Sequence, residues 1–297
     1  GLDTFMNTYP ERFFDVGIAE QHGVTMAGGL ASQGFIPVVA IYSTFLQRSY
    51  DQIIHDIALP GLHVIFAVDR AGLVGEDGPT HHGTLDIAFL RSIPGMTIMA
   101  PIDEDELVSM FDFALKMEGP CAVRYPKASA LGKKRMKYCL DIEYGKGVLL
   151  KDGKDIGIIA IGSMVYPSLE ASLILEKQGL SVSVVNARFA KPIDELLISK
   201  VINKCKNILV VEEASVIGGL GSAVADIILK DGETKIKFAH LGIPDGFVTH
   251  GPRELLLAKC KLSTLGIVEA ALSLYKNKTP KNAATKIQSS IPTGIKV

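Results

Sequence analysis

The 297-residue sequence has no tryptophan, few cysteines and almost no charge imbalance. Lysine and arginine total 31 against 32 aspartate and glutamate, so a formal net charge of -1 gives no electrostatic reason to expect nucleic-acid binding. The four cysteines form no Cys-x-x-Cys pair, which favours reduced, buried thiols over a zinc site or a disulfide framework. No apolar run is long enough to cross a membrane and residues 1–11 lack a signal-peptide pattern, so we expect a soluble protein with no membrane partner.

The order of apolar segments indicates a parallel α/β protein. Apolar runs of strand length alternate with stretches of helical spacing over most of the chain, which is typical of layered parallel folds. The expected strands cover residues 35–41, 63–68, 96–100, 121–125, 155–161, 181–186, 207–212 and 235–241. The expected helices cover residues 44–58, 85–91, 104–117, 167–178, 194–204, 220–230, 253–259 and 263–275. We therefore predict two doubly wound domains.

The pattern divides between these domains near the middle of the chain. The first domain is expected over residues 1–130, and it begins without the strand that such a domain needs at its start. Periodicity then fades into a basic stretch at 131–146, which we interpret as a linker, and it resumes over 147–277. Residues 278–297 are polar and without a pattern, which is typical of a loose tail.

Two local patterns carry weaker signals. Asp103 followed by Glu106 predicts a capping box at the start of the helix over 104–117. The segment GGLGS at 218–222 follows a predicted strand, as a dinucleotide-binding loop would, but it lacks the third glycine and the later acid of that fingerprint. We interpret it as a glycine-rich helix start that permits close packing.

One carboxylate, Glu20, stands between a short apolar run and a segment of helical spacing that is rich in small residues. The predicted inward positions of that segment are Val24, Ala27, Gly28 and Ala31. A carboxylate at the start of so closely packed a helix would be poorly solvated, and desolvation raises the pKa of an acid, so Glu20 is a candidate to hold a proton near neutrality. The alternative is an acid that only complements the helix dipole.

Three arginines lie at the edges of apolar segments, where arginine is unusual without a partner: Arg48, Arg70 and Arg124. The carboxyl ends of parallel strands form the crevice where such folds bind ligands, and guanidinium groups bind phosphate oxygens through paired, charge-assisted hydrogen bonds. The alternative is ordinary ion pairing. Candidate partners are Asp51, Asp69 and Asp77.

Four segments in this order and at these distances carry a family resemblance: DVGIAEQH at 15–22, IYSTFLQRSYDQ at 41–52, DRAGLVGEDGPTHHG at 69–83 and VRYPK at 123–127. Together they resemble the 1-deoxy-D-xylulose-5-phosphate synthases, thiamine-diphosphate enzymes of the transketolase superfamily. The resemblance implies a pyrimidine-binding domain followed by a transketolase C-terminal-like domain. It also implies an upstream domain that binds the cofactor's diphosphate and Mg2+ through a Gly-Asp-Gly motif, which this sequence does not contain.

The resemblance implies roles for particular side chains. Glu20 matches the acid that activates the cofactor's aminopyrimidine ring, Phe45 matches the aromatic residue that stacks on that ring, and Ile18 is expected to contact the cofactor. Asp77 and His81 match positions that recognise the substrate's hydroxyl and carbonyl groups and transfer protons. The positions that match the substrate's phosphate site are Tyr42, Arg48, Arg70 and Arg124.

Some neighbouring residues are expected to have no such role. Phe45 would also suit an ordinary core position, because apolar residues at helical spacing are usually buried. His82 is expected to be a bystander, since adjacent residues in a loop or strand point in different directions. No carboxylate or cysteine repeats at ligand spacing near these histidines, so no metal site is expected in this chain.

The implied activity is the condensation of pyruvate with glyceraldehyde 3-phosphate, with loss of CO2, to give 1-deoxy-D-xylulose 5-phosphate for isoprenoid and thiamine biosynthesis. A homodimer in the bacterial cytoplasm or the plastid stroma is expected. Without a diphosphate-binding domain, the chain alone is expected to be inactive. Alternatives are the beta subunit of a 2-oxo acid dehydrogenase, the carboxyl half of a split transketolase, and a non-catalytic dimerisation module. The STFLQR and DGPTHHG segments argue against the first two, and the joint presence of Glu20, Phe45, Arg48 and His81 argues against the third.

Overall fold

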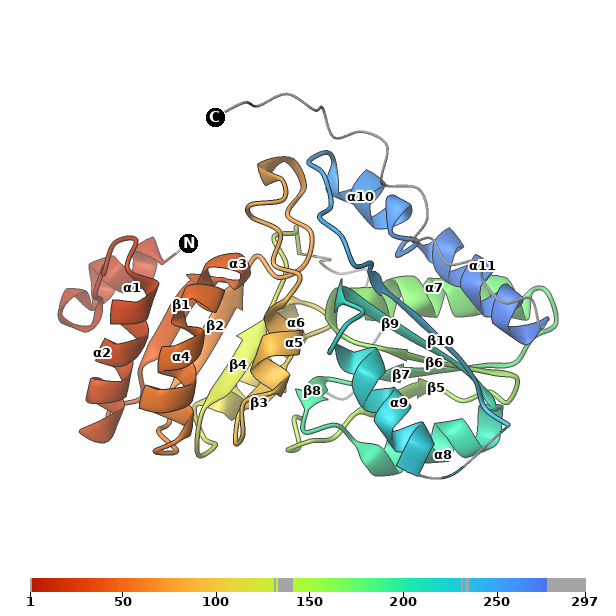
Figure 1. The fold of residues 1–297 in the computed structure, drawn as a ribbon, viewed down its shortest axis with the longest axis horizontal. Coiled ribbons are helices and arrows are strands. Elements are labelled where there is room, and N and C mark those ends of the chain that lie inside the picture. The colour runs from red at the N-terminus through yellow and green to blue at the C-terminus, as the bar shows by residue number, and fades with distance from the viewer. Residues whose placement is uncertain (1, 131, 133–140, 231, 233–234, 277–297) are drawn as a thin grey trace, which may run out of the picture.

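The computed structural model describes residues 2–130, 132, 141–230, 232 and 235–276. It contains two five-stranded sheets, each with four parallel strands and one antiparallel strand at an edge. The sheets lie side by side, one in each half of the molecule, with helices against their faces (Figure 1). The predicted α/β class is therefore confirmed. Within the described residues, no helix combines the length and the hydropathy that a membrane crossing requires.

The first sheet has the strand order β1-β2-β4-β3-β8. Its strands are β1 (Val38–Tyr42), β2 (Ile65–Asp69), β4 (Cys121–Arg124), β3 (Thr97–Met99) and β8 (Phe189–Lys191). The accompanying helices are α1 (Asp3–Thr8), α2 (Glu20–Ser32), α3 (Ser43–Leu46), α4 (Tyr50–Gln52), α5 (Asp86–Arg91) and α6 (Glu104–Ala114). Short helical turns connect them: η1 (Pro10–Arg12), η2 (Gln47–Ser49), η3 (Ile53–Ala58) and η4 (Gly75–Asp77). The helix predicted over 44–58 is thus a continuous series of helical turns of changing pitch.

The second sheet has the strand order β10-β9-β6-β7-β5. Its strands are β10 (Lys237–Ile243), β9 (Asn207–Ser215), β6 (Ile156–Ala160), β7 (Val182–Asn186) and β5 (Val148–Lys151). The helical segments are η6 (Gly162–Met164), α7 (Val165–Glu176), α8 (Glu195–Cys205), α9 (Leu220–Lys230), α10 (Arg253–Lys259) and α11 (Thr264–Tyr275). All eight predicted strands are present within a few residues of their expected bounds.

Two strands were not predicted, and both are antiparallel edges. β5 pairs with β7, and β8 pairs with β3 of the other sheet, with Met99 opposite Phe189. A strand from the second half of the sequence therefore completes the first sheet. Most of the expected linker (131 and 133–140) and all of the expected tail (278–297) lie outside the described residues.

The two halves pack through a shared apolar core. One cluster of buried side chains includes Leu90 from α5, Ile161 after β6 and Leu220 from α9. Beside it, Arg91 Nη1 donates to the carbonyl oxygens of Gly218 and Gly219, both at 2.6 Å. Because α5 lies against β9, the loop that precedes α5 is carried to the second sheet.

The two local patterns of the sequence have different outcomes. Asp103 caps α6 as predicted, accepting hydrogen bonds from the amides of Asp105 and Glu106 at 3.1 Å. Glu106 does not complete the capping box, because its buried carboxylate accepts from the Ile102 amide and pairs with Arg188 at 2.7 Å. Burial raises the pKa of Glu106 against the lowering effect of these partners.

The glycine-rich start of α9 is confirmed as a close-packing feature. A Cβ atom on Gly221 would lie 2.3 Å from the ring of His240, which itself bonds to Glu212 at 2.6 Å. The Glu212 carboxylate also accepts from the amides of Leu220 and Gly221 at 2.8 Å. The amides of Leu220 and Gly221 in the first turn of α9 are therefore hydrogen-bonded to a carboxylate of the protein itself.

Gly221→Ala should lower the free energy of unfolding by about 1–3 kcal/mol, because the added methyl group displaces the His240 ring from Glu212. The matched control is Gly29→Ala within α2, where a Cβ meets nothing within 4 Å. That control should be neutral or stabilising by up to about 1 kcal/mol. Urea unfolding followed by circular dichroism measures both variants, and equal midpoints would contradict the packing account.

Candidate active site

The candidate site begins at the first turn of α2. Val24 and Ala27 are buried, Ala31 packs at the edge of the core, and a Cβ on Gly28 would lie 3.1 Å from the backbone oxygen of Asp56. The predicted small-residue face is therefore confirmed, since only small side chains let α2 approach this close to η3. The Glu20 side chain at the start of the helix is 11% exposed, as expected for a poorly solvated carboxylate.

A continuous series of contacts leads from Glu20 across the ends of the strands. Arg48 Nη1 donates to Glu20 Oε1 at 2.7 Å, and the Arg48 guanidinium lies 4.8 Å from the centre of the Phe45 ring. Phe45 stacks on Tyr42 with 5.7 Å between ring centres, and the Arg70 guanidinium lies 3.9 Å from the centre of the Tyr42 ring. The structure thus brings five of the predicted residues together.

Their meeting follows from the sheet. Tyr42 ends β1 and pairs in register with Asp69 at the end of β2, and Arg70 follows directly. Because β1, β2 and β4 are parallel neighbours, the residues after each strand emerge at the same edge. Phe45 and Arg48 lie in the helical turns that follow β1.

Residues 70–84 form the loop after β2 and bring Asp77 and His81 to this edge. Asp77 Oδ2 lies 3.3 Å from Arg70 Nη1 and 2.8 Å from Lys127 Nζ. The hydrogen bond from Lys127 holds the pKa of Asp77 below its usual value, and the charge of Arg70 adds to this effect. His81 meets the Phe45 ring edge-on at 5.3 Å, and its Nδ1 lies 2.9 Å from Thr80 Oγ1.

Arg124 is not brought into this group. Its side chain is 5% exposed, its Nε donates to Asp86 Oδ2 at 2.8 Å, and its Nη2 donates to the Glu213 carbonyl at 3.2 Å. The sequence pointed to other aspartates as partners and missed Asp86. Of the cations in the VRYPK segment, Lys127 is the accessible one, with 48% of its side chain exposed. The position of Lys127 three residues after the end of β4 was the signal that could have identified it.

Ile18 and His82 occupy opposite environments. Ile18 is 92% exposed in the segment before α2, so its apolar side chain is available to a ligand beside Glu20. His82 is buried, its Nδ1 accepts from the Val74 amide at 3.1 Å, and its Nε2 faces the Thr249 carbonyl at 3.2 Å. These bonds select the neutral Nε2–H tautomer and give His82 the structural role expected of a bystander.

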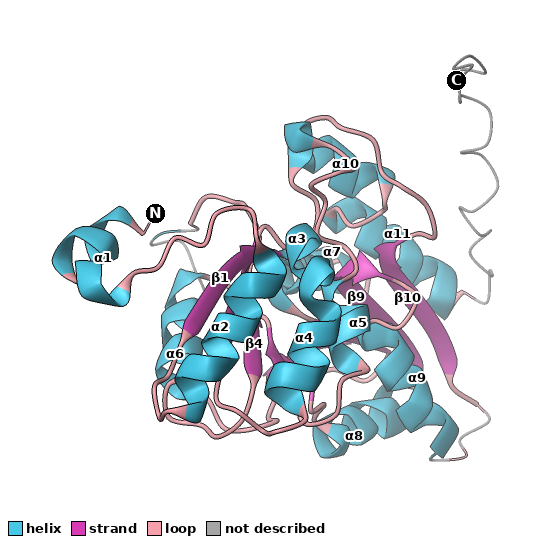
Figure 2. Cartoon of the chain, turned by 60° about the vertical axis from the view of Figure 1, so that its left-hand side comes forward, coloured by secondary structure: helices cyan, strands magenta, loops and turns pink. Residues whose placement is uncertain are grey.

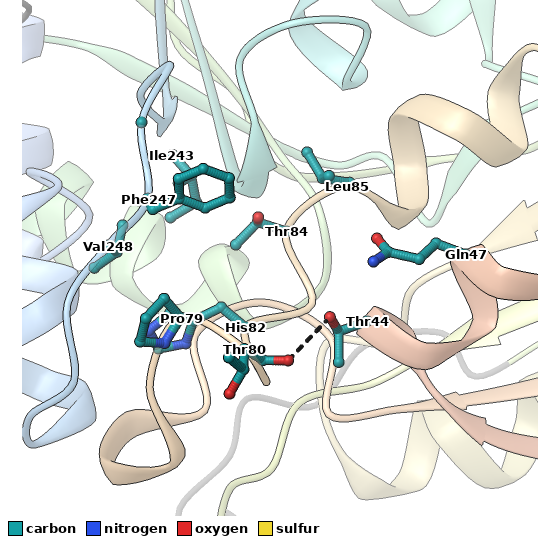
Figure 3. Close-up of a pocket in the computed structure, with 11 residues that line it drawn as sticks. Thr44, Gln47, Pro79, Thr80, His82, Thr84, Leu85, Ile243, Phe247 and Val248 are labelled. Carbon is teal, nitrogen blue, oxygen red and sulfur yellow. Dashed lines mark hydrogen bonds between the residues drawn. The ribbon is translucent and has the colours of Figure 1, made fainter. Parts of the chain in front are cut away.

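A pocket of about 310 Å3 lies between the loop over 79–85 and the segment after β10 (Figure 3). Its described lining residues are Thr44, Gln47, Pro79, Thr80, His82, Thr84, Leu85, Ile243, Gly246, Phe247 and Val248. None of the residues predicted for the site is among them. Thr44 Oγ1 donates to the Thr80 carbonyl at 3.4 Å. Because Thr44 precedes Phe45 and Thr80 precedes His81 in the chain, the pocket adjoins the Phe45–His81 ring contact.

The side chains near Glu20 fit part of a thiamine cofactor. Glu20 and Phe45 both contact Arg48. A carboxylate in this position can hydrogen-bond to an aminopyrimidine, and an aromatic ring beside it can stack on that ring. The described residues contain no cluster of three or more histidine, cysteine or acidic side chains that could hold a metal ion. The fit therefore concerns the aminopyrimidine end.

Comparison with known proteins agrees with this geometry. Residues 1–131 match the family described as "Transketolase, pyrimidine binding domain", and residues 145–267 match "Transketolase, C-terminal domain". The structure superposes with a TM-score of 0.80 and 32% identity on a solved chain titled "Split gene transketolase, inactive beta4 tetramer", covering 93% of this chain and 88% of that one. The chain belongs to the transketolase family.

Within the transketolase family, the sequence corresponds to the carboxyl-terminal part of 1-deoxy-D-xylulose-5-phosphate synthases. It is 50% identical over 278 residues to the synthase of Halothermothrix orenii, covering 94% of this chain and 44% of that protein. It is 51% identical over 270 residues to the synthase of Magnetococcus marinus, covering 90% of this chain and 43% of that protein. The chain therefore spans less than half of these relatives, and the predicted resemblance is confirmed over that span.

Proposed function

We propose that this chain supplies the pyrimidine-binding and C-terminal domains of a 1-deoxy-D-xylulose-5-phosphate synthase. The complete enzyme condenses pyruvate with glyceraldehyde 3-phosphate, with loss of CO2, to give 1-deoxy-D-xylulose 5-phosphate. The observation that carries the proposal is the unbroken series of contacts from Glu20 through Arg48, Phe45 and Tyr42 to Arg70. An acid for the cofactor and a cation for a sugar phosphate are thereby held on one edge of one sheet.

The cofactor end of the site lies at α2. Bound thiamine diphosphate supplies the electron sink that decarboxylation of a 2-oxo acid requires. Glu20 would hydrogen-bond to the aminopyrimidine and exchange a proton with it, while Arg48, which pairs with the Glu20 carboxylate, orients that group. Phe45 and Ile18 provide apolar contact for the same ring.

The acceptor end of the site lies at the ends of β2 and β4. We assign the phosphate to Arg70 and Lys127, two cations that flank Asp77, with Tyr42 beside them. This assignment replaces Arg124, which is buried and donates from Nε and Nη2 to groups within the protein. Asp77 would then accept a hydrogen bond from a hydroxyl group of glyceraldehyde 3-phosphate. His81 would transfer a proton at the carbonyl oxygen of the same substrate.

A second candidate function is the carboxyl half of a split transketolase, favoured by the 32% identity to the structure of that title. The two functions differ in substrates, because a synthase needs pyruvate and releases CO2, whereas a transketolase takes a ketose phosphate donor. In both, the proposal includes a homodimer, in the bacterial cytoplasm or in the plastid stroma. The exposed apolar side chains of α1, which stands away from the rest of the chain (Figure 2), support such an assembly.

The chain alone should bind thiamine diphosphate poorly and form no product. Mixing it with the separately expressed diphosphate-binding domain of the Halothermothrix orenii relative should restore formation of 1-deoxy-D-xylulose 5-phosphate from pyruvate and glyceraldehyde 3-phosphate. Calorimetry with Mg2+ and product chromatography measure the two steps, and each part alone is the control. Tight cofactor binding by the isolated chain, or turnover only with a ketose phosphate donor, would refute the synthase assignment.

A further inference from the structure

The loop over residues 70–84 is held by an ion pair that belongs to the other half of the molecule. Glu213, on β9, is 1% exposed, and its Oε1 accepts from the Leu73 amide at 2.9 Å. Arg253, the first residue of α10, donates from Nη2 to Glu213 Oε2 and from Nε to the Leu73 carbonyl at 3.0 Å. Both backbone groups of Leu73 are therefore bound by one buried pair of opposite charges.

The surroundings of the pair leave it little freedom. Ser163 Oγ donates to Glu213 Oε2 at 2.6 Å, so both carboxylate oxygens have partners. A Cβ atom on Gly72 would lie 2.6 Å from the Glu213 side chain, so the loop touches the carboxylate directly. A buried charge is tolerated when its hydrogen-bonding groups have partners. Here two of those bonds involve the loop: the Leu73 amide donates to Glu213, and the Leu73 carbonyl accepts from Arg253.

Residues 249–253 run beside the same loop and add three further contacts. Thr249 offers its carbonyl to His82, a Cβ on Gly78 would lie 3.2 Å from the Cβ of His250, and the Gly251 amide donates to the Gly75 carbonyl at 3.3 Å. Figure 1 shows this loop rising next to α10. The part of the loop that carries Asp77 and His81 is thus positioned by the second half of the chain.

We propose that Glu213 and Arg253 are positioning residues for Asp77 and His81, so that the acceptor site takes its shape only when the C-terminal half is packed against the loop. This inference rests on the proposed function for the identity of the substrate. The loop's dependence on the ion pair can be tested without it. Neither residue touches substrate in this account, and both act through the backbone of Leu73.

The first test measures amide hydrogen exchange in the full chain. Glu213→Gln and Arg253→Met should each speed exchange of peptides within residues 70–84 by about tenfold or more, because each removes a charge-assisted bond that holds Leu73. The matched control is Glu106→Gln, which breaks the buried pair with Arg188 and does not contact this loop. Loop exchange unchanged in both variants, or raised equally in the control, overturns the proposal.

The second test uses the chain combined with its diphosphate-binding partner. Both variants should raise the KM for glyceraldehyde 3-phosphate by about tenfold and leave the KM for pyruvate within about twofold, because only the acceptor loop is displaced. Arg253→Lys, which keeps the charge, should recover part of the loss. Equal effects on both substrates overturn the proposal.

If the unaltered complex makes no product, the proposed function fails, and the hydrogen-exchange result alone decides whether Glu213 and Arg253 position the loop. If Glu213→Gln does not fold, Arg253→Met decides, since that side chain is 19% exposed on a peripheral helix.

Discussion

Replacing Glu20 by glutamine should lower the turnover of the assembled synthase by about two to four orders of magnitude, the range that a positioned acid or base contributes. Glutamine keeps the shape of the side chain and a hydrogen-bonding oxygen, but it has no carboxyl proton to share with an aminopyrimidine. The loss should appear both in product formation and in the rate of proton exchange at the thiazolium carbon. Cofactor affinity should change far less, because the aromatic and apolar contacts of Phe45 and Ile18 remain.

The ion pair with Arg48 supplies the control for this experiment. Glu20→Gln leaves the Arg48 guanidinium without its charged partner, so part of any loss could come from a displaced arginine. Arg48 is 52% exposed, and Arg48→Met should therefore affect stability little. If the acid itself is essential, the double variant will be as inactive as Glu20→Gln alone. A glutamine variant that keeps a tenth of the activity would count against the acid role.

The sequence was sufficient for the buried parts of the fold. The six central parallel strands are covered on both faces, so they read as uninterrupted apolar runs, and they were predicted together with the parallel edge strands β1 and β10. The two missed strands, β5 and β8, lie at sheet edges. β5 is only half-buried along its length and β8 has three residues, so neither leaves a strong pattern. The pairing of β8 with β3 also joins segments some ninety residues apart, which no local pattern records.

The same limit applies within the site. The strand ends placed Tyr42, Arg70 and the loop after β2 on one edge, and that grouping could be inferred from topology. Which carboxylate each cation meets depends on side-chain packing between elements distant in sequence. Arg48 and Arg124 were both predicted to bind phosphate. In the structure Arg48 pairs with Glu20 and keeps 52% of its side chain exposed, whereas Arg124 is buried against Asp86. The contribution of Glu213 and Arg253 was missed for the same reason.

Arg124→Met should lower the free energy of unfolding by about 3–5 kcal/mol, because it leaves the carboxylate of Asp86, which is fully buried, without a counter-charge. The methionine also gives up the bond to the Glu213 carbonyl, which links the two halves of the chain. Set against a total stability of about 5–15 kcal/mol, this loss should shift the urea midpoint strongly. Asp86→Asn combined with Arg124→Met should lower the free energy of unfolding by less than the sum of the two single changes. The reason is that asparagine is uncharged, so the double variant leaves no buried charge without a partner.

Lys127→Met is the matched variant, and it separates a structural cation from a functional one three residues away. Its side chain is half-exposed, so the free energy of unfolding should stay within about 0.5 kcal/mol of the original. The pKa of Asp77 should rise toward its ordinary value, since the bond from Lys127 is the largest cause of its depression, and carboxyl resonances in NMR titrations report this directly. In the assembled enzyme the KM for glyceraldehyde 3-phosphate should rise while that for pyruvate does not. The opposite pattern, with Arg124→Met stable and defective only toward the phosphorylated substrate, would return the phosphate to Arg124 and remove Lys127 from the site.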